Sequence, residues 1–180
     1  MILLLVAVLF SAAVWQLLRF GDQDSRESAP AGEPPAAVTP ATEATITASI
    51  YLPARDLSRI DLFSVELPDR RADLQKWVEA LFSAFSSPPS NTALPILAAN
   101  TVPRHVFVDE NQTLYLDMPA SFAEAPPTGA EMEILTIQSI VRTLTENISG
   151  VKAVKILMEG SDRDTLWGHV DVRNPIGPRP

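Results

Sequence analysis

The chain has no cysteine among its 180 residues and only two histidines, His105 and His169. Without cysteine there can be no disulfide, no thiolate metal site, no cysteine nucleophile and no lipid attached through a cysteine. Two histidines are too few for a typical zinc site without unusual help from carboxylates. Glycine is scarce, and the Gly-Lys-Ser/Thr and Gly-x-Ser-x-Gly sequences are both missing, so neither a phosphate loop nor a nucleophile elbow is expected. We therefore expect no metal, no cofactor and no small-molecule substrate.

Basic residues are also in the minority. The chain has 14 Lys and Arg against 22 Asp and Glu, which gives a formal net charge of -8 and a sequence pI of about 4.7. No basic stripe occurs along it. Binding to nucleic acid rests on positive charge placed against phosphates, so we expect no nucleic-acid partner.

The N-terminus holds a long apolar run, with no charged side chain from Ile2 to Leu18. A helix of roughly 20 apolar residues crosses a bilayer core. Trp15 and Arg19 lie near one end, where an aromatic ring and a snorkelling cation are favoured. We predict an uncleaved transmembrane signal-anchor over residues 1–20. A cleaved signal peptide, with Ser11-Ala12-Ala13 as its site, and a buried core helix are the alternatives.

Residues 21–44 are dominated by Pro, Ala, Ser and acidic side chains, a composition that buries too little apolar surface to fold. We predict a disordered linker here, and hence a single-pass protein of the cell membrane whose folded domain is extracytoplasmic. The charged residues beside the predicted span give only a weak prediction of its orientation in the membrane. Arg19 and Arg26 follow it, which read literally places the domain in the cytoplasm, but three acidic residues are interleaved with or follow these arginines.

Regular patterning begins at Thr45, and we expect one domain over residues 45–176 with a flexible tail at 177–180. Alternating or β-rich runs predict strands at 45–52, 62–67, 102–108, 113–118, 151–158 and 165–172. Helical spacing predicts two helices. The resulting order is β-β-α-β-β-α-β-β. It indicates an α+β fold with one mixed, mostly antiparallel sheet and both helices on one face.

The first predicted helix has Asp69 as its N-cap, and Trp77 lies in the middle of its apolar stripe. That stripe is Leu74, Trp77, Val78, Leu81, Phe82 and Phe85. We expect it to be core, with Trp77 buried against the sheet. The second helix begins near Gly129 with a capping box, Thr128 to Glu131. Its stripe is Ile134, Ile137, Ile140, Val141, Leu144 and Ile148.

The end of the second helix is expected at Gly150, which can adopt the left-handed conformation that closes a helix. The strand that follows carries Lys152 and Lys155, and we expect both of these lysines to be exposed.

Three segments resemble the GerMN domain, a bacterial module named for sporulation and spore germination proteins. Residues 116–122, Leu-Asp-Met-Pro-Ala-Ser-Phe, are similar to its V-D-L-S-x-x-F segment. Residues 144–154 are similar to L-T-E-x-x-G-V-x-x-V, and residues 165–172 to T-L-x-G-H-V-D-L. The three occur in family order. The resemblance implies a single-copy extracytoplasmic module of envelope or sporulation assemblies, similar in build to ring-building motifs. It implies no reaction and supplies no catalytic residue.

Four side chains could gather into an acid–base site: Asp117, Glu131, His169 and Asp171. We instead expect Asp117 and Asp171 to accept hydrogen bonds from backbone, and His169 to be a half-buried strand residue with a satisfied ring. The sequence thus favours a non-enzymatic interaction or assembly module. A cell-wall-active hydrolase, or the auxiliary domain of one, is the alternative and requires a cleft with converging carboxylates and His169.

As an interaction module the domain is expected to dock a sheet edge or a helix face against another envelope protein or its own copy. Exposed charges flanking the second helix or the last predicted strand, such as Lys152 and Arg173, are the expected contacts.

Overall fold

A computed structural model describes residues 43–124 and 129–179. The predicted anchor at 1–20 and the linker up to residue 42 lie outside these ranges, as does residue 180 of the predicted tail. Among the helices of the described ranges, none has the length and apolar character needed to cross a bilayer.

The described chain starts with a hairpin. Strands β1 (Thr45–Pro53) and β2 (Ile60–Pro68) pair antiparallel along their whole length, from Thr45 opposite Pro68 to Pro53 opposite Ile60. Alternate residues of β1 face the core because strand side chains alternate between faces. Ala48, Ile50 and Leu52 are buried on that face.

Helix α2 (Leu74–Ser86) follows the hairpin and buries the predicted stripe, except that Leu74 is only partly covered. The predicted N-cap was wrong. Asp73 caps the helix by accepting from the amide of Lys76, whereas Asp69 pairs with Arg71 in the turn before it. The acid nearest the first helical residue satisfies an otherwise unpaired amide of the first turn.

The second sheet has the order β3 (His105–Val108), β4 (Thr113–Met118), β5 (Ala153–Met158). β3 and β4 are antiparallel, but β4 and β5 are parallel. Two helices lie between β4 and β5 in the chain, the short α3 (Ser121–Glu124) and the long α4 (Ala130–Asn147). A parallel pair needs such a crossover, which explains the parallel register.

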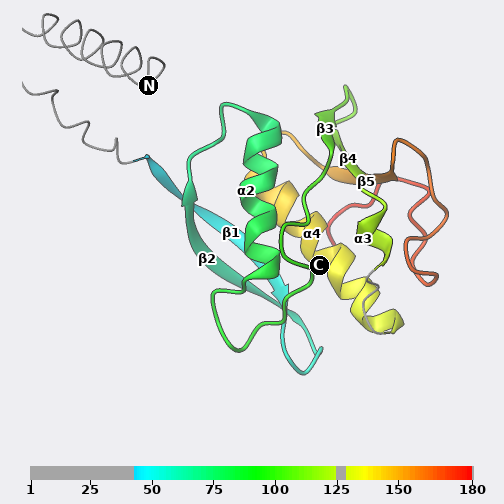
Figure 1. Cartoon of the computed structure of the whole chain (residues 1–180), viewed down its shortest axis with the longest axis horizontal. Helices are drawn as coiled ribbons and strands as arrows, with labels where there is room; N and C mark the ends of the chain where they lie inside the picture. The colour runs from blue at the N-terminus through cyan, green and yellow to red at the C-terminus, as the bar shows by residue number, and fades with distance from the viewer. Residues whose placement is uncertain (1–42, 125–128, 180) are drawn as a thin grey trace, which may run out of the picture. The chain divides into compact units, whose positions relative to one another are not determined.

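The single sheet expected from sequence was wrong, because the strands form two separate sheets within an α+β fold. α4 contacts β1 of the hairpin and β5 of the other sheet, and α2 contacts both β1 and β3. Figure 1 shows the hairpin on one side of α2, with the three-stranded sheet on the other. The helices are thus packed between two sheets rather than laid on one face of one sheet.

Side chains of α4 occupy the edge of β1 that faces away from β2. The amide of Ser49 donates to Asn147 Oδ1 at 2.9 Å, and Asn147 Nδ2 donates back to the Ser49 carbonyl at 2.7 Å. One step further, the amide of Tyr51 donates to Thr143 Oγ1 at 3.0 Å. Two strand residues and four helix residues advance by about 6–7 Å each, so strand and helix stay in step. This helix therefore satisfies backbone groups that an edge strand would otherwise leave open.

The next pair in that series would be Pro53 with Ser139. Proline has no amide hydrogen, and the hydroxyl of Ser139 is fully buried without a hydrogen-bond partner.

Thr143→Val should lower the free energy of unfolding by about 1–3 kcal/mol, because it leaves the Tyr51 amide without its hydrogen-bond acceptor. Ser139→Ala, on the same helix face, should change stability by less than about 0.5 kcal/mol, because it removes an unpaired hydroxyl. Urea unfolding of both variants checks this; equal losses would mean that the Thr143 bond contributes nothing.

The predicted capping box of α4 was wrong as well. The N-cap is Gly129, at φ +88°, and it has no side chain to bond the first turn. Thr128 lies outside the described residues. At the other end Gly150 has φ +83°, the left-handed conformation expected there, two residues beyond the C-cap Ile148.

The last predicted strand does not form. Between Thr165 and Val172 there is one isolated bridge, Thr165 with Asp171. Side chains take the backbone groups that a ladder would use: Glu133 accepts from the amides of His169 and Val170, and Lys155 Nζ donates to the carbonyl of Val172. The segment is a loop held by non-local polar contacts.

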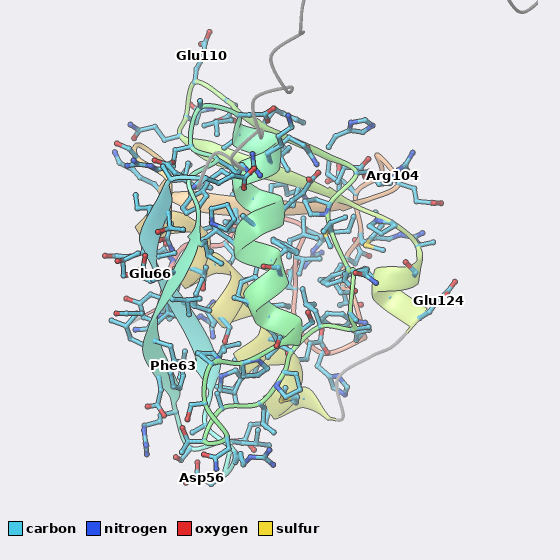
Figure 2. The ribbon with its side chains drawn as sticks, turned by 60° about the vertical axis from the view of Figure 1, so that its left-hand side comes forward. Asp56, Phe63, Glu66, Arg104, Glu110 and Glu124 are labelled. Atoms are coloured by element: carbon cyan, nitrogen blue, oxygen red, sulfur yellow. The ribbon has the colours of Figure 1, made fainter. Side chains whose placement is uncertain are left out.

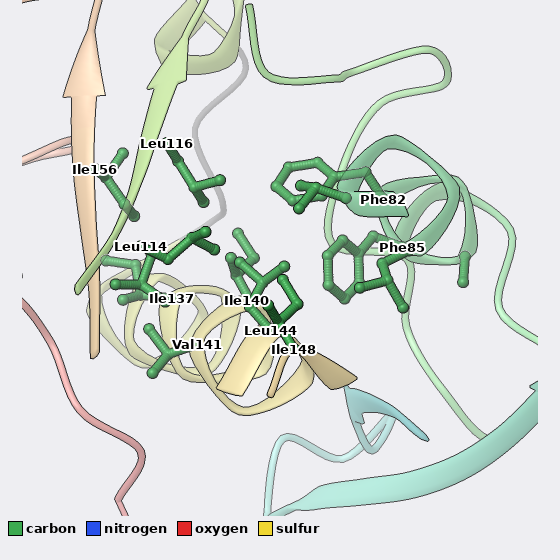
Figure 3. Packing of buried hydrophobic residues seen from close by; sticks show 14 of the residues in the cluster. Phe82, Phe85, Leu114, Leu116, Ile137, Ile140, Val141, Leu144, Ile148 and Ile156 are labelled. Atoms are coloured by element: carbon green, nitrogen blue, oxygen red, sulfur yellow. The ribbon is translucent and has the colours of Figure 1, made fainter. Parts of the chain in front are cut away.

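One hydrophobic core connects all these elements. Figure 3 shows Phe82 and Phe85 of α2 beside the apolar side chains of α4, with Leu114 and Leu116 of β4 beyond them. Phe82 and Phe85 meet edge to face at 5.2 Å between ring centroids. Trp77 is buried as expected, and its indole Nε1 donates to the carbonyl of Asn147 at 3.2 Å.

Candidate functional site

The four side chains proposed from sequence for acid–base chemistry do not gather into one site, and only His169 and Asp171 line the same surface pocket. Asp117 is the next-to-last residue of β4, Glu131 is exposed in the first turn of α4, and Asp171 pairs with Arg173 in the C-terminal segment. His169 makes no hydrogen bond or ion pair with the other three and bonds instead to Glu133. Within the described ranges, no group of three or more His, Asp or Glu side chains could hold a metal ion.

Asp117 is a buried strand-end acid, as expected. Its Oδ1 accepts from the amide of Gly160 at 2.6 Å, and its Oδ2 lies 3.7 Å from the guanidinium of Arg104. These contacts join the end of β4 to the turn after β5. Asp117 thus positions backbone.

Asp171 is also bonded as expected. Its Oδ1 accepts from the amide of Arg173 at 2.9 Å, and the guanidinium of Arg173 reaches both carboxylate oxygens. The hydrogen bonds from the Arg173 side chain lower the pKa of Asp171 to about 2. Asp171 therefore stays ionised and paired across the physiological pH range, which makes it a poor proton donor.

Glu133 is the buried acid that sequence reasoning missed. Its side chain has no exposure, and it accepts three hydrogen bonds from one loop. The donors are the amide of His169 at 3.1 Å, the amide of Val170 at 3.0 Å and His169 Nδ1 at 2.8 Å. A buried carboxylate is tolerated only with such partners. Glu133 therefore anchors the loop that carries the Gly-His-Val-Asp sequence.

The signal for Glu133 was present in the helical spacing. Glu133 stands four residues before Ile137, seven before Ile140 and eleven before Leu144, which places it on the buried stripe of α4. Ile134, which the prediction placed on that stripe, is 40% exposed. A carboxylate at a core position of an amphipathic helix is informative because it needs donors from elsewhere.

Lys155 was predicted to be exposed, and this was wrong. Its side chain is nearly fully buried, and Nζ donates to the carbonyls of Val172 and Arg173 and pairs with Asp162 at 2.7 Å. The C-terminal segment also exchanges two backbone hydrogen bonds between Ile176 and Val154, at 2.9 and 2.8 Å. The outer edge of β5 is thereby covered. Lys152 is exposed, as predicted.

The outer edge of β2 is left open. Because the Ser49 backbone points away from β2 to reach Asn147, Ser49 and Ser64 form a non-hydrogen-bonded pair, and the backbone of Ser64 points away from β1. By the same alternation, so do the backbones of Leu62 and Glu66. Among residues 43–124 and 129–179 these groups have no backbone partner. Leu62, one of these three edge residues, is also 54% exposed.

β2 is thus the long strand with an unpaired edge. β1 is covered by α4 and β5 by the C-terminal segment, while β3 is only four residues long and packs against α2. Figure 2, which labels Phe63 and Glu66, shows β2 at the margin of the described molecule. We call the backbone of residues 60–66 on this side the β2 edge. It is a candidate protein interface rather than a reaction centre.

A family model described as Germane, sporulation and spore germination, matches residues 49–164 of the chain, well over half of its length. The chain belongs to the Germane family. The match runs from β1 to beyond β5 and ends just before the segment 165–172. The GerMN resemblance read from the sequence is confirmed.

Solved structures of GerMN domains have the same fold. The tandem GerMN domains of the sporulation protein GerM from Bacillus subtilis are 18% identical and superpose with a TM-score of 0.61 over 74% of this chain. This Germane chain spans 46% of that tandem structure. The first GerMN domain of the same protein is also 18% identical, with a TM-score of 0.57 over 98% of its length.

A putative lipoprotein from Clostridium perfringens is 21% identical, with a TM-score of 0.50 over 74% of this chain and 87% of its own. A comparison with curated proteins gives no match. At these identities the solved structures establish the fold of the Germane domain and leave its function to be inferred from the site.

Proposed function

We propose that this Germane domain is a non-enzymatic interaction or assembly module of the cell envelope, tethered to the membrane through residues 1–20 and extracytoplasmic. The tether and the location are supported by the charge-free run from Ile2 to Leu18 and by the Pro-rich segment after it. The family's association with sporulation and spore germination supports an assembly role. The non-enzymatic reading is supported by the carboxylates of Asp117 and Asp171, which are committed to structural bonds.

The observation that carries the proposal is the open β2 edge. An exposed row of amides and carbonyls can accept an extended segment of another protein as an added strand. The expected partner is an extended segment of another envelope protein. A second copy is less suited, because each chain carries a net charge of -8 and two copies repel one another. The last predicted strand, which was one of the two places where docking contacts were expected, does not form a strand.

The test uses the intact protein captured from its native membranes. Ser64→Pro removes an amide that points to the β2 edge and leaves the β1–β2 ladder intact, since Pro is tolerated on the open side of an edge strand. We expect capture of the partner to fall at least about tenfold, the loss expected when about 1.4 kcal/mol of pairing disappears. Ser64→Ala is the matched control, because it removes the same hydroxyl and keeps the amide. It should capture normally.

Three further outcomes divide the alternatives. Normal capture by Ser64→Pro together with loss in Lys152→Glu would move the interface to the far end of α4, as the sequence first suggested. Capture of the tagged protein's own untagged copy would make the partner a second chain. A folded His169→Ala/Asp171→Ala variant that keeps its partner but loses activity on a cell-wall or peptide substrate would establish the hydrolase alternative and reject the interaction module.

A further inference from the structure

A surface pocket of about 200 Å³ opens between α4 and the C-terminal segment, and it shares no residue with the β2 edge. Its apolar wall consists of Ile134, Ile137 and Ile176, and its polar rim includes His169, Asp171 and Arg179. Ile134, which lines the pocket, is 40% exposed to solvent. An exposed isoleucine beside oriented polar groups is the usual composition of a small-ligand pocket.

The imidazole at the rim is held in one orientation. Its Nδ1 lies 2.8 Å from Oε2 of Glu133, a carboxylate that is fully buried and already accepts two backbone amides. The second ring nitrogen, Nε2, is not used by Glu133, and the side chain of His169 is 52% exposed. The orientation of the ring is therefore fixed by Glu133, with Nε2 left for other partners.

Arg179 carries a charge at the rim, and neither of the two nearby acids, Asp171 and Glu133, is paired with it. Both oxygens of Asp171 are held by the guanidinium of Arg173, and both oxygens of Glu133 are taken by the His169–Val170 loop. The carboxylate oxygens of both acids are thus already bonded to protein groups. Arg179 lies on the rim as an exposed cation, kept in place through its amide, which donates to Gln138 Oε1 at 3.0 Å.

We propose that this pocket binds a small aliphatic carboxylate. The apolar body lies on the isoleucine wall, and the carboxylate accepts from the Arg179 guanidinium at the rim. A cavity of about 150 Å³ can hold benzene, so a pocket of about 200 Å³ has room for a branched chain of about four to six carbons. The same chemistry is offered by a free short-chain acid and by the C-terminal leucine or valine of a peptide.

The experiment titrates the full-length protein in lipid nanodiscs with isovalerate, following the ¹⁵N signals of His169 and the heat of binding. Isovalerate should bind saturably and shift the Nε2 signal, whereas isoamylamine, with the same body and a cationic head, should not. Arg179→Gln should weaken binding at least about tenfold, the loss of one charge-assisted contact. Ile134→Glu should do the same by placing a negative charge on the wall. Leu62→Glu, on the hairpin, is the control and should bind normally.

Titration with N-acetyl-leucine and with its amide distinguishes a free short-chain acid from a peptide C-terminus as the ligand. Binding of N-acetyl-leucine at least about tenfold tighter than isovalerate, and no binding of the amide, would assign the pocket to a peptide C-terminus. Equal affinities of the two acids would assign it to a free acid. The inference is overturned if isoamylamine binds as well as isovalerate, or if Arg179→Gln, an exposed position that should not affect folding, leaves the affinity unchanged. Because no β2 residue takes part, failure here leaves the proposed docking edge untouched.

Discussion

Glu133→Ala is expected to lower the free energy of unfolding by about 3–5 kcal/mol, although Glu133 belongs to no apolar cluster. The substitution removes the acceptor for the amides of His169 and Val170 and for His169 Nδ1. Each amide left unpaired in the interior costs about 1–3 kcal/mol. Removal of the fully buried side chain also leaves a cavity. Urea unfolding monitored by tryptophan fluorescence measures the loss.

Glu131→Ala is the matched control for this variant. Glu131 lies in the same first turn of α4 but is exposed, so its loss should remove only a favourable interaction with the helix N-terminus, less than about 1 kcal/mol. His169→Ala should also cost about 1 kcal/mol or less, since Glu133 keeps both backbone donors and the imidazole is half exposed. Equal losses for Glu133→Ala and Glu131→Ala would show that the loop is not anchored by Glu133.

Trp77→Ala should cost about 3–5 kcal/mol, the range for deleting a large buried aromatic side chain. Trp77 is 4% exposed, and besides its packing it donates from Nε1 to the Asn147 carbonyl at the end of α4. The variant therefore leaves a cavity and an unpaired carbonyl at the place where α4 also holds the edge of β1. Thermal and urea melts of the variant give the value.

Phe107→Ala provides the comparison at an exposed aromatic. Phe107 is 49% exposed and stacks on Tyr115 at 4.6 Å between ring centroids, so about 0.5–1.5 kcal/mol is expected. A loss below 1 kcal/mol for Trp77→Ala would mean that the α2 stripe contributes little to the core despite its burial.

Local patterning predicted most elements of this fold. The strand at 113–118 was placed without error, and the stripe of α2 was correct because its six apolar residues repeat with helical period. The pairing of strands was not predictable in this way. β4 and β5 are parallel because α4 connects them in the chain. β1 does not join the other strands in a single sheet, because the side chains of Thr143 and Asn147 bond to its outer edge.

The candidate sites show the same division. Asp117 and Asp171 accept backbone hydrogen bonds as expected, because Asp does so readily near strand ends and turns. The predicted exposure of Lys155 and the predicted strand at 165–172 were both wrong, and for the same reason. Backbone groups in residues 165–172 form hydrogen bonds with the side chains of Glu133 and Lys155, and both side chains lie far from this segment in the sequence. A period-2 pattern describes local preference and carries no information about such distant acceptors and donors.

Hydrogen exchange at single-residue resolution tests the docking proposal most directly. The intact protein is compared in nanodiscs alone and after loading with the partner captured from its membranes. If an extended segment adds to the β2 edge, the amides of Leu62, Ser64 and Glu66 should exchange at least about tenfold more slowly in the complex, while those of Phe63 and Val65, already paired to β1, should not change. Unchanged exchange at Leu62, Ser64 and Glu66 in a complex that demonstrably contains the partner would contradict the account.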